Sequence, residues 1–171
     1  AVPDVIFAKN LVRTYNWDCY FKTLGYNASL ILNETNATRT GAWGSNTFTT
    51  TTFETGNNFS SESGEAYIYY CFAEKQGYSK FGSYTGNGNA DGTFVYTGFK
   101  PAFVIAKNTG ATEGWSLFDN KRDRLNVANE QLFPNTSGAE ESNDEVDLLS
   151  NGFKLRRNNS RMNGSNSVSY T

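Results

Sequence analysis

Histidine is absent from the 171-residue sequence, and cysteine occurs only twice. Without an imidazole the chain has no base for a Ser-His-Asp or Cys-His arrangement and no His-ligated metal site. The commonest designs of hydrolases and zinc proteins are therefore excluded. We expect a protein without enzymatic activity.

Charge is also scarce. Charged residues make up 19% of the chain, and the formal net charge is −2. The positive residues are scattered apart from the run Lys154-Leu155-Arg156-Arg157. Nucleic-acid binding requires a basic patch, and a membrane-spanning helix requires about 20 consecutive apolar residues. The sequence has neither, so we expect no nucleic acid and no membrane as a partner.

The two cysteines, Cys19 and Cys71, both lie in the first half of the chain. Free cysteine is among the most buried residue types, so we expect two buried small hydrophobic side chains. The alternative is a disulfide, which would indicate an oxidising compartment.

Aromatic and turn-forming residues are abundant. Aromatic residues reach 15% of the chain, and Gly, Asn, Ser and Thr crowd the spaces between short apolar runs. This composition favours short strands joined by turns, with enough aromatic surface to build a core. Only residues 120–130 have a pattern that would allow a helical turn or two, and the asparagines there weaken it.

The sequence contains an internal repeat. The run from Pro3 to Asn10 is matched by the run from Pro101 to Asn108, and both end in Ala-Lys-Asn. Further matches follow in order, and they pair Trp17 with Trp115, Cys19 with Leu117, Leu30 with Leu132, Asn33 with Asn135, Phe53 with Phe153 and Tyr70 with Tyr170. The period is about 98 to 102 residues, and such self-similarity indicates a duplicated structural unit.

Each copy shows the periodicity of strands. We expect strands at residues 5–8, 17–21, 29–32, 46–53 and 65–72, and again at 94–96, 103–106, 115–119, 131–133, 145–149, 153–155 and 165–171. Short strands at this spacing, separated by turn residues, are typical of an antiparallel sandwich. We predict an all-β protein, an antiparallel β-sandwich of jelly-roll or concanavalin-like type in two tandem copies.

The repeat divides the chain into residues 1–77 and 78–171. The first unit lacks its leading strand, and the second is truncated in its last strand, because the chain is out of phase with its own repeat. We expect an excised segment of a longer tandem array. The alternative is a permuted assembly in which a neighbouring chain supplies the missing strands.

One loop, Gly86 to Gly92, has the residues of a calcium site. The oxygen atoms of Asn87, Asn89 and Asp91 alternate with glycine and could bind Ca²⁺. The loop offers a single carboxylate, however, and Asn-Gly and Asp-Gly are first of all turn signals. We expect no cofactor, with a structural Ca²⁺ in this loop as the alternative.

Several aromatic residues fall in segments expected to be exposed loops. Trp43, Tyr26 and Tyr84 are the candidate residues for stacking on sugar rings, and Tyr15 and Tyr78 belong to the same group. Trp17 and Trp115, by contrast, occupy equivalent strand positions, and we expect both in the core.

The second copy also carries an acidic cluster. It consists of Glu140, Glu141, Asp144, Glu145 and Asp147. Acidic loops are usually solvated, and we expect this of the cluster. The alternative is a carboxylate pair of a glycosidase, which would exist in one copy only.

A family resemblance is carried by five segments, which are Tyr69–Glu74, Gly77–Gly88, Asp91–Gly92, Phe94–Pro101 and the turn Ser150–Leu155. Over them the sequence resembles a domain that recurs in tandem in uncharacterised structural proteins, tail-fibre-like or capsid-associated, of marine and cyanobacterial tailed phages. The likeness is close over residues 69–107 and covers about two thirds of the chain. It implies a concanavalin-like or related β-sandwich on the outside of a virion, and it brings no catalytic residues.

Together these observations predict a non-enzymatic structural protein of the virion, part of a tail fibre, an appendage or the capsid surface. Its expected partners are other virion proteins or copies of itself, and host-surface glycans held by many weak contacts. The alternative is a secreted bacterial adhesin or a carbohydrate-binding module of a larger protein.

Overall fold

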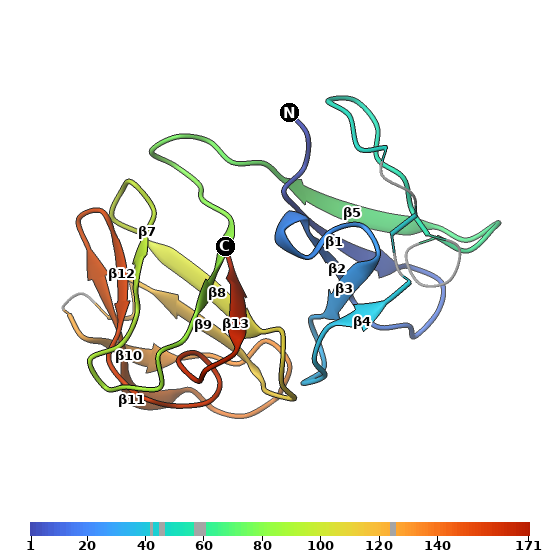
Figure 1. Cartoon of the computed structure of the whole chain (residues 1–171). Helices are drawn as coiled ribbons and strands as arrows, with labels where there is room; N and C mark the ends of the chain where they lie inside the picture. Colours follow the sequence, from blue (N-terminus) through green and yellow to red (C-terminus); the bar gives the residue numbers. More distant parts are fainter. Residues whose placement is uncertain (42, 45–46, 57–60, 124–125) are drawn as a thin grey trace.

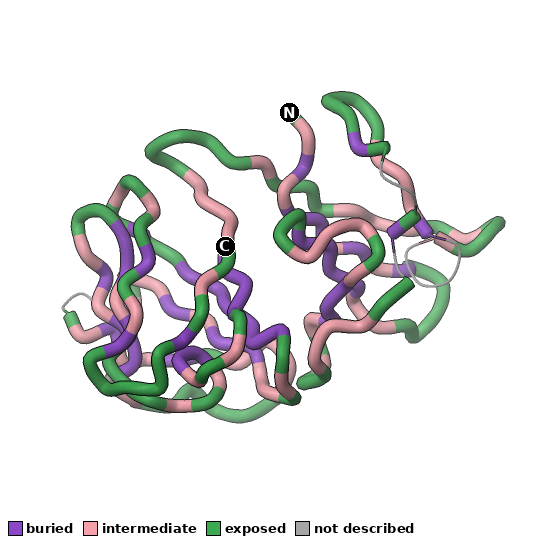
Figure 2. The backbone as a smooth tube through the Cα atoms, viewed as in Figure 1, coloured by how far each residue is buried: buried purple, intermediate pink, exposed green. Residues whose placement is uncertain are grey.

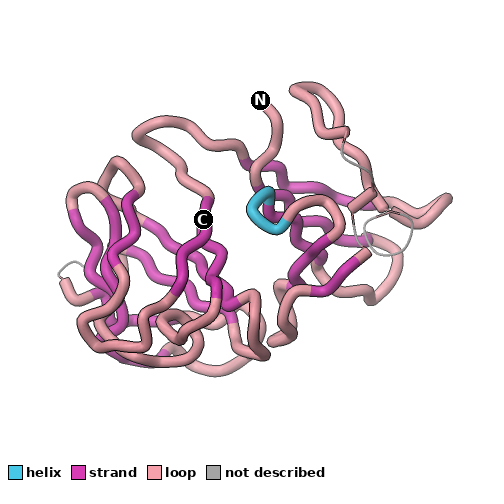
Figure 3. The backbone as a smooth tube through the Cα atoms, in the orientation of Figure 1, coloured by secondary structure: helices cyan, strands magenta, loops and turns pink. Residues whose placement is uncertain are grey.

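The computed structural model describes residues 1–41, 43–44, 47–56, 61–123 and 126–171. The fold is all-β, with three antiparallel sheets and, in these ranges, one short 3-10 helix, η1 (Lys22–Leu24) (Figure 3). The strands are β1 (Val5–Asn10), β2 (Asp18–Phe21), β3 (Ala28–Ile31), β4 (Arg39–Thr40), β5 (Tyr67–Phe72), β6 (Gly82–Thr85), β7 (Phe94–Tyr96), β8 (Phe103–Asn108), β9 (Trp115–Asp119), β10 (Ala128–Gln131), β11 (Glu141–Leu149), β12 (Gly152–Leu155) and β13 (Ser167–Tyr170). No helix of the described ranges has the length and hydrophobicity of a membrane-spanning segment.

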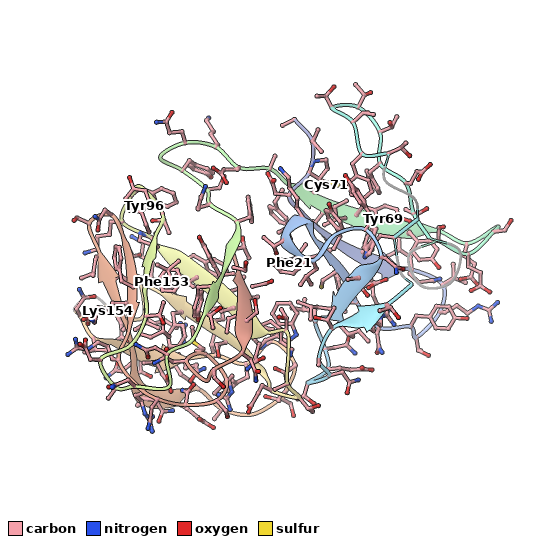
Figure 4. All side chains as sticks on the ribbon, in the orientation of Figure 1. Phe21, Tyr69, Cys71, Tyr96, Phe153 and Lys154 are labelled. Carbon is pink, nitrogen blue, oxygen red and sulfur yellow. The ribbon has the colours of Figure 1, made fainter. Side chains whose placement is uncertain are left out.

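Two of the sheets form a sandwich from the second half of the chain. One has the strand order β10-β11-β12-β7 and the other β6-β13-β8-β9. Between them lies the largest core, in which Phe118, Val146, Phe153 and Val168 are fully buried. Figure 4 places Phe153 between the two sheets of the sandwich. The predicted sandwich architecture is thus present in residues 82–170.

The third sheet comes from the first half and has the order β4-β3-β2-β1-β5. One of its faces packs on the outer side of β8 and β9, as the arrangement in Figure 1 shows, and a second core lies between them. There the ring of Phe21 lies 6.1 Å from that of Trp115, and the Trp115 Nε1–H donates to the Ile31 carbonyl at 2.8 Å. The molecule therefore has three β layers in contact.

The other face of the first sheet is covered by a loop. Trp43 and Phe48 of this loop pack on Ile6 and Tyr20. We predicted a strand at 46–53; residue 46 lies outside the described ranges, and 47–53 form no strand. The Thr49 hydroxyl accepts the N–H groups of the residues two and three positions further on, and this turn replaces the strand. The described residues thus give a second sheet only to the second half.

The two halves share a framework. The order β2-β1-β5 in the first half corresponds to β9-β8-β13 in the second. The pair of Cys19 and Leu30, which joins β2 to β3, has its counterpart in the isolated bridge between Leu117 and Leu132. After β1, the Asn10 Oδ1 accepts the N–H groups two and three residues further on, and the Asn108 Oδ1 does the same after β8.

The tryptophan positions are equivalent as well. The Trp17 N–H donates to the Asn33 Oδ1 at 2.9 Å, and the Trp115 N–H donates to the Asn135 Oδ1 at 2.8 Å. The two rings differ, since Trp115 is fully buried and Trp17 is only half-buried. The prediction that both lie in the core is right for Trp115 alone.

One of the sequence matches is shifted by a residue. Ala8 of β1 lies opposite Tyr69, and its counterpart Ala106 lies opposite Tyr170, so Tyr69 rather than Tyr70 corresponds to Tyr170. The contacts agree, because Tyr69 packs edge-on against Phe53 at 5.2 Å and Tyr170 edge-on against its counterpart Phe153 at 5.4 Å. We interpret the shared contacts as those of a duplicated unit.

Both cysteines are free thiols. Cys19 lies opposite Phe7 of β1, whereas Cys71 lies opposite the preceding residue, Ile6. Successive residues of a strand point to opposite faces, so the two thiols cannot meet. The expectation of burial is right for Cys19 and wrong for Cys71, which is exposed on β5 (Figure 4).

Candidate functional site

An aromatic cleft lies where the connection from β5 to β6 passes the segment that leads into β8. Its volume is about 340 Å³. Tyr78 lines it from the connection, Phe99 and Phe103 from the segment before and into β8, and the buried Phe153 and Tyr170 from the core. Tyr78 and Phe103 are 78% and 50% exposed, so both rings offer free surface. Figure 2 shows the exposed course of the connection.

A tight turn presents Tyr78. The Lys75 carbonyl accepts the N–H groups of Tyr78 at 3.0 Å and Ser79 at 2.9 Å, and the Ser79 hydroxyl donates to the Ala73 carbonyl at 3.0 Å. Gly77 has a φ of +74°, a conformation that glycine adopts without steric cost. The Lys75 Nζ lies 5.8 Å from the centre of the Tyr78 ring. The turn thus holds the ring outward at the mouth of the cleft.

The opposite side is held by the loop after β7. The Asn151 carbonyl accepts the N–H groups of Thr97 at 3.0 Å and Gly98 at 3.1 Å. The Thr97 hydroxyl donates to the Phe99 carbonyl at 2.6 Å. These bonds tie the loop to the turn between β11 and β12 and fix the backbone around Phe99.

Polar groups complete the cleft. The Lys80 Nζ lies 2.7 Å from the Glu74 Oε1 in a surface ion pair. Burial raises the pKa of Tyr170 further above neutrality, and its protonated hydroxyl can donate a hydrogen bond. Exposed aromatic rings beside a few donors are the chemistry that stacks on a sugar ring and hydrogen-bonds its hydroxyls.

The three aromatic residues singled out from the sequence lie elsewhere. Trp43 has no exposed surface, and Tyr26 packs on Tyr20 with ring centres 5.7 Å apart. The Tyr84 hydroxyl donates to the Met162 carbonyl at 2.9 Å, and its ring lies against the sandwich core. A fully buried ring cannot stack on a sugar, so assigning Trp43 to a binding site is corrected to a core role. Tyr26 and Tyr84 are partly buried and pack against the two cores.

The loop with Asn87, Asn89 and Asp91 is built as a turn. The Asn87 Oδ1 accepts the Asn89 N–H, and the Asn89 Oδ1 accepts the Asp91 N–H, both at 3.0 Å. The Asp91 Oδ1 lies 2.5 Å from the Lys154 Nζ, and that hydrogen bond lowers the pKa of Asp91. The side-chain oxygens thus accept backbone N–H groups and a lysine pairs with the carboxylate, which are the contacts expected of a turn.

The acidic cluster divides. Glu140 and Glu141 are exposed, as expected, whereas Glu145 is 3% exposed and receives hydrogen bonds from Asn159. Burial raises the pKa of Glu145, although the nearby Arg157 opposes the shift. The side chain of Asp144 lies outside the described part. Within that part, no group of three or more Cys, Asp or Glu side chains is placed to hold a metal ion.

Sequence reasoning included Tyr78 among its wider candidates but missed Phe99 and Phe103. Phe103 begins the apolar run Phe-Val-Ile-Ala of β8, and a continuous run gives no sign that its first residue is half exposed. The Gly-Phe-Lys-Pro sequence before β8 was the available signal, since it marks a turn that carries an aromatic residue.

Comparison with protein families gives a match over nearly the whole chain. The family described as "Domain of unknown function (DUF7483)" matches residues 1–170. No curated protein matches the chain, and no solved structure does. Because the match extends over nearly the whole chain, the protein belongs to the DUF7483 family.

Proposed function

We propose that the protein is a non-enzymatic structural component of a virion surface, and that it attaches to glycans through the aromatic cleft. The observation that carries the proposal is the pair of exposed rings, Tyr78 and Phe103, at the mouth of one cavity. Aromatic faces that remain in contact with water in a preformed cleft are a platform for the apolar faces of sugars.

The location on a virion is supported by the sequence resemblance to phage structural proteins over residues 69–107. A module repeated on a particle converts weak contacts into strong attachment through avidity. Proteomic analysis of purified virions tests this part. Its expected result is the polypeptide among the particle proteins, and its absence from the particles would contradict the location.

Glycan binding is tested by a titration of the full chain with neutral oligosaccharides of glucose, galactose and mannose, followed by ¹H–¹⁵N NMR. We expect saturable shifts at residues 78–80 and 97–103 for at least one sugar, with millimolar affinity. Tyr78→Ala should weaken that binding at least tenfold. The matched control is Tyr96→Ala, since Tyr96 is 64% exposed on β7 and does not line the cleft (Figure 4).

A secreted adhesin or carbohydrate-binding module is the second candidate, and the same cleft supports it. The binding experiment does not separate the two, but the source of the native protein does. Recovery of the protein from a bacterial culture supernatant in the absence of phage particles would favour the second candidate.

A further inference from the structure

A cluster of hydrogen-bonded side chains around Asn33 in the first half has no equivalent around Asn135 among the described residues of the second half. In the first half the Asn33 Nδ2 donates to the Asn16 Oδ1 at 2.7 Å, and the Asn16 Nδ2 in turn donates to Glu34. The Asn33 Oδ1 is already used by the Trp17 N–H. The amide of Asn33 therefore has a partner for both of its ends.

The second half leaves the same place open. Gly114 stands where the first half has Asn16, and Thr136 where it has Glu34. The Asn135 Oδ1 still accepts the tryptophan N–H, but in the described part of the chain its Nδ2 has no acceptor. A Cβ on Gly114 would lie 3.3 Å from the Asn135 Oδ1, 3.6 Å from the Asn135 Nδ2 and 3.7 Å from the Arg161 Nε. The glycine thus leaves the two donors, the Asn135 Nδ2 and the Arg161 Nε, free of the contact that a side chain at this position would make.

That space is a cavity of about 370 Å³, lined by Gly114, Phe133, Asn135 and Arg161 among others. The Arg161 guanidinium lies over the Phe133 ring, with its Cζ 4.6 Å from the ring centre. Its Nε is buried without a hydrogen-bond partner, although the Arg161 charge also acts on Glu145, where it opposes the rise in the pKa of that carboxyl caused by burial. A guanidinium positioned by a ring, with a buried N–H that lacks an acceptor, is suited to bind a carboxylate.

The residues at the rim of the cavity restrict the chemistry of the ligands that can bind there. It carries the hydroxyls of Thr35 and Thr136 and the carboxylates of Glu140 and Glu141, of which Glu140 is paired with Arg122. These groups accept hydrogen bonds from hydroxyls, and their charge repels ligands with several negative charges. A ligand that satisfies both the floor and the rim has one carboxylate and several hydroxyls.

We propose that this cavity binds the carboxylate of an acidic saccharide, with Arg161 and the Asn135 amide as donors and the rim as the acceptor of ring hydroxyls. The site lies apart from the aromatic cleft, with which it shares no lining residue. The proposal goes beyond attachment at that cleft and does not depend on it.

The test is a matched pair of ligands that differ only in the carboxylate, methyl β-D-glucuronide and methyl β-D-glucoside. In an NMR titration of the full chain the glucuronide should shift residues 114, 133–136 and 161 with millimolar affinity, at least tenfold tighter than the glucoside. Sodium acetate should bind at least tenfold more weakly than the glucuronide, and added salt should weaken glucuronide binding. Equal binding of the glucoside would overturn the carboxylate site, and equal binding of acetate would overturn the saccharide.

Variants test the geometry. Arg161→Met keeps an apolar chain on Phe133 and should abolish the preference for the glucuronide. Gly114→Asn introduces the side chain found in the first half and should block binding while the protein stays folded. Arg156→Met is the control for charge, because Arg156 lies outside this cavity and faces Asp147 at 3.5 Å. Unchanged binding in either the Arg161 or the Gly114 variant, with thermal unfolding like that of the wild type, would contradict the site.

Discussion

The two halves of the chain build the same framework and finish it differently. In both, an asparagine caps the first strand and a second asparagine holds the tryptophan N–H. In the second half a four-stranded sheet covers this framework, and in the first half a loop covers it. The framework therefore depends on a few side chains that bond to the backbone. The cavities and exposed rings depend instead on residues around the framework, for example on Gly114 in the second half, where the first half has Asn16.

The tryptophans should give the largest difference between the halves. Trp115→Ala removes a fully buried ring and its hydrogen bond to Ile31 across the layers, so we expect a loss of about 4 kcal/mol in the free energy of unfolding. Trp17→Ala removes a half-buried ring stacked on Tyr70, with an expected loss of about 1–2 kcal/mol. Urea unfolding of both variants measures this. Equal losses would contradict the distinction between a layer contact and a surface contact.

The equivalent lysines come next. Lys107 is fully buried, and burial lowers its pKa to about 8. The unfolded chain then binds a proton at this lysine that the folded chain does not between about pH 8 and the ordinary lysine value near 10.4, so Lys107 contributes a rise in stability with pH across this window. Below about pH 8 both states are protonated, and the cost of the buried charge, about 3 kcal/mol, is fully present.

Lys107→Met should therefore remove that rise with pH and raise the free energy of unfolding at pH 7. The gain is reduced by the loss of the hydrogen bond from Lys107 to the Asn108 carbonyl. Lys9→Met, the equivalent substitution in the half-buried position of β1, is the control and should keep the rise. The measurement is the free energy of unfolding of the wild type and both variants at pH 7, 8, 9 and 10. A slope unchanged by Lys107→Met would show that the lysine does not cause it.

The smallest expected difference concerns the two cysteines, which should differ in their reactivity toward a thiol reagent. Cys71 is exposed and Cys19 is buried, and burial raises the pKa of Cys19 well above its usual value. A thiol reagent at pH 8 should modify one cysteine of the native protein rapidly and the second only after denaturation. Peptide mapping should place the rapid modification on Cys71, and rapid modification of Cys19 would mean that the first sheet does not pack on the sandwich.

Much of the fold was predictable from local pattern. The apolar runs of β1 and β8 and the tryptophan strands β2 and β9 were found because their alternation and turn residues are local signals. Of the strand predicted at 46–53, the described residues 47–53 form none, because the Thr49 hydroxyl accepts nearby backbone N–H groups in a turn. Two short strands, β4 and β6, were missed, since Arg39–Thr40 and Gly82–Thr85 contain few apolar residues.

The sites were less predictable. Exposure of an aromatic residue depends on which layer covers it, and no local pattern says that a loop folds Trp43 inward while a turn holds Tyr78 outward. The Arg161 cavity depends on a glycine, an asparagine and an arginine far apart in the sequence. The alignment of the repeats does pair Gly114 with Asn16. That Asn16 accepts the Asn33 amide, a contact which glycine cannot make, is visible only in the structure.

The central claim is that the second half, and not its equivalent in the first, is the binding half. One NMR titration of the full chain with a mixed neutral and acidic disaccharide, such as one of glucuronic acid and glucose, tests it most directly. We predict shifts in residues 78–80, 97–103, 114, 133–136 and 161, with none in residues 16, 33 and 34. Shifts centred on the first half, or no saturable shift at millimolar sugar, would contradict the account.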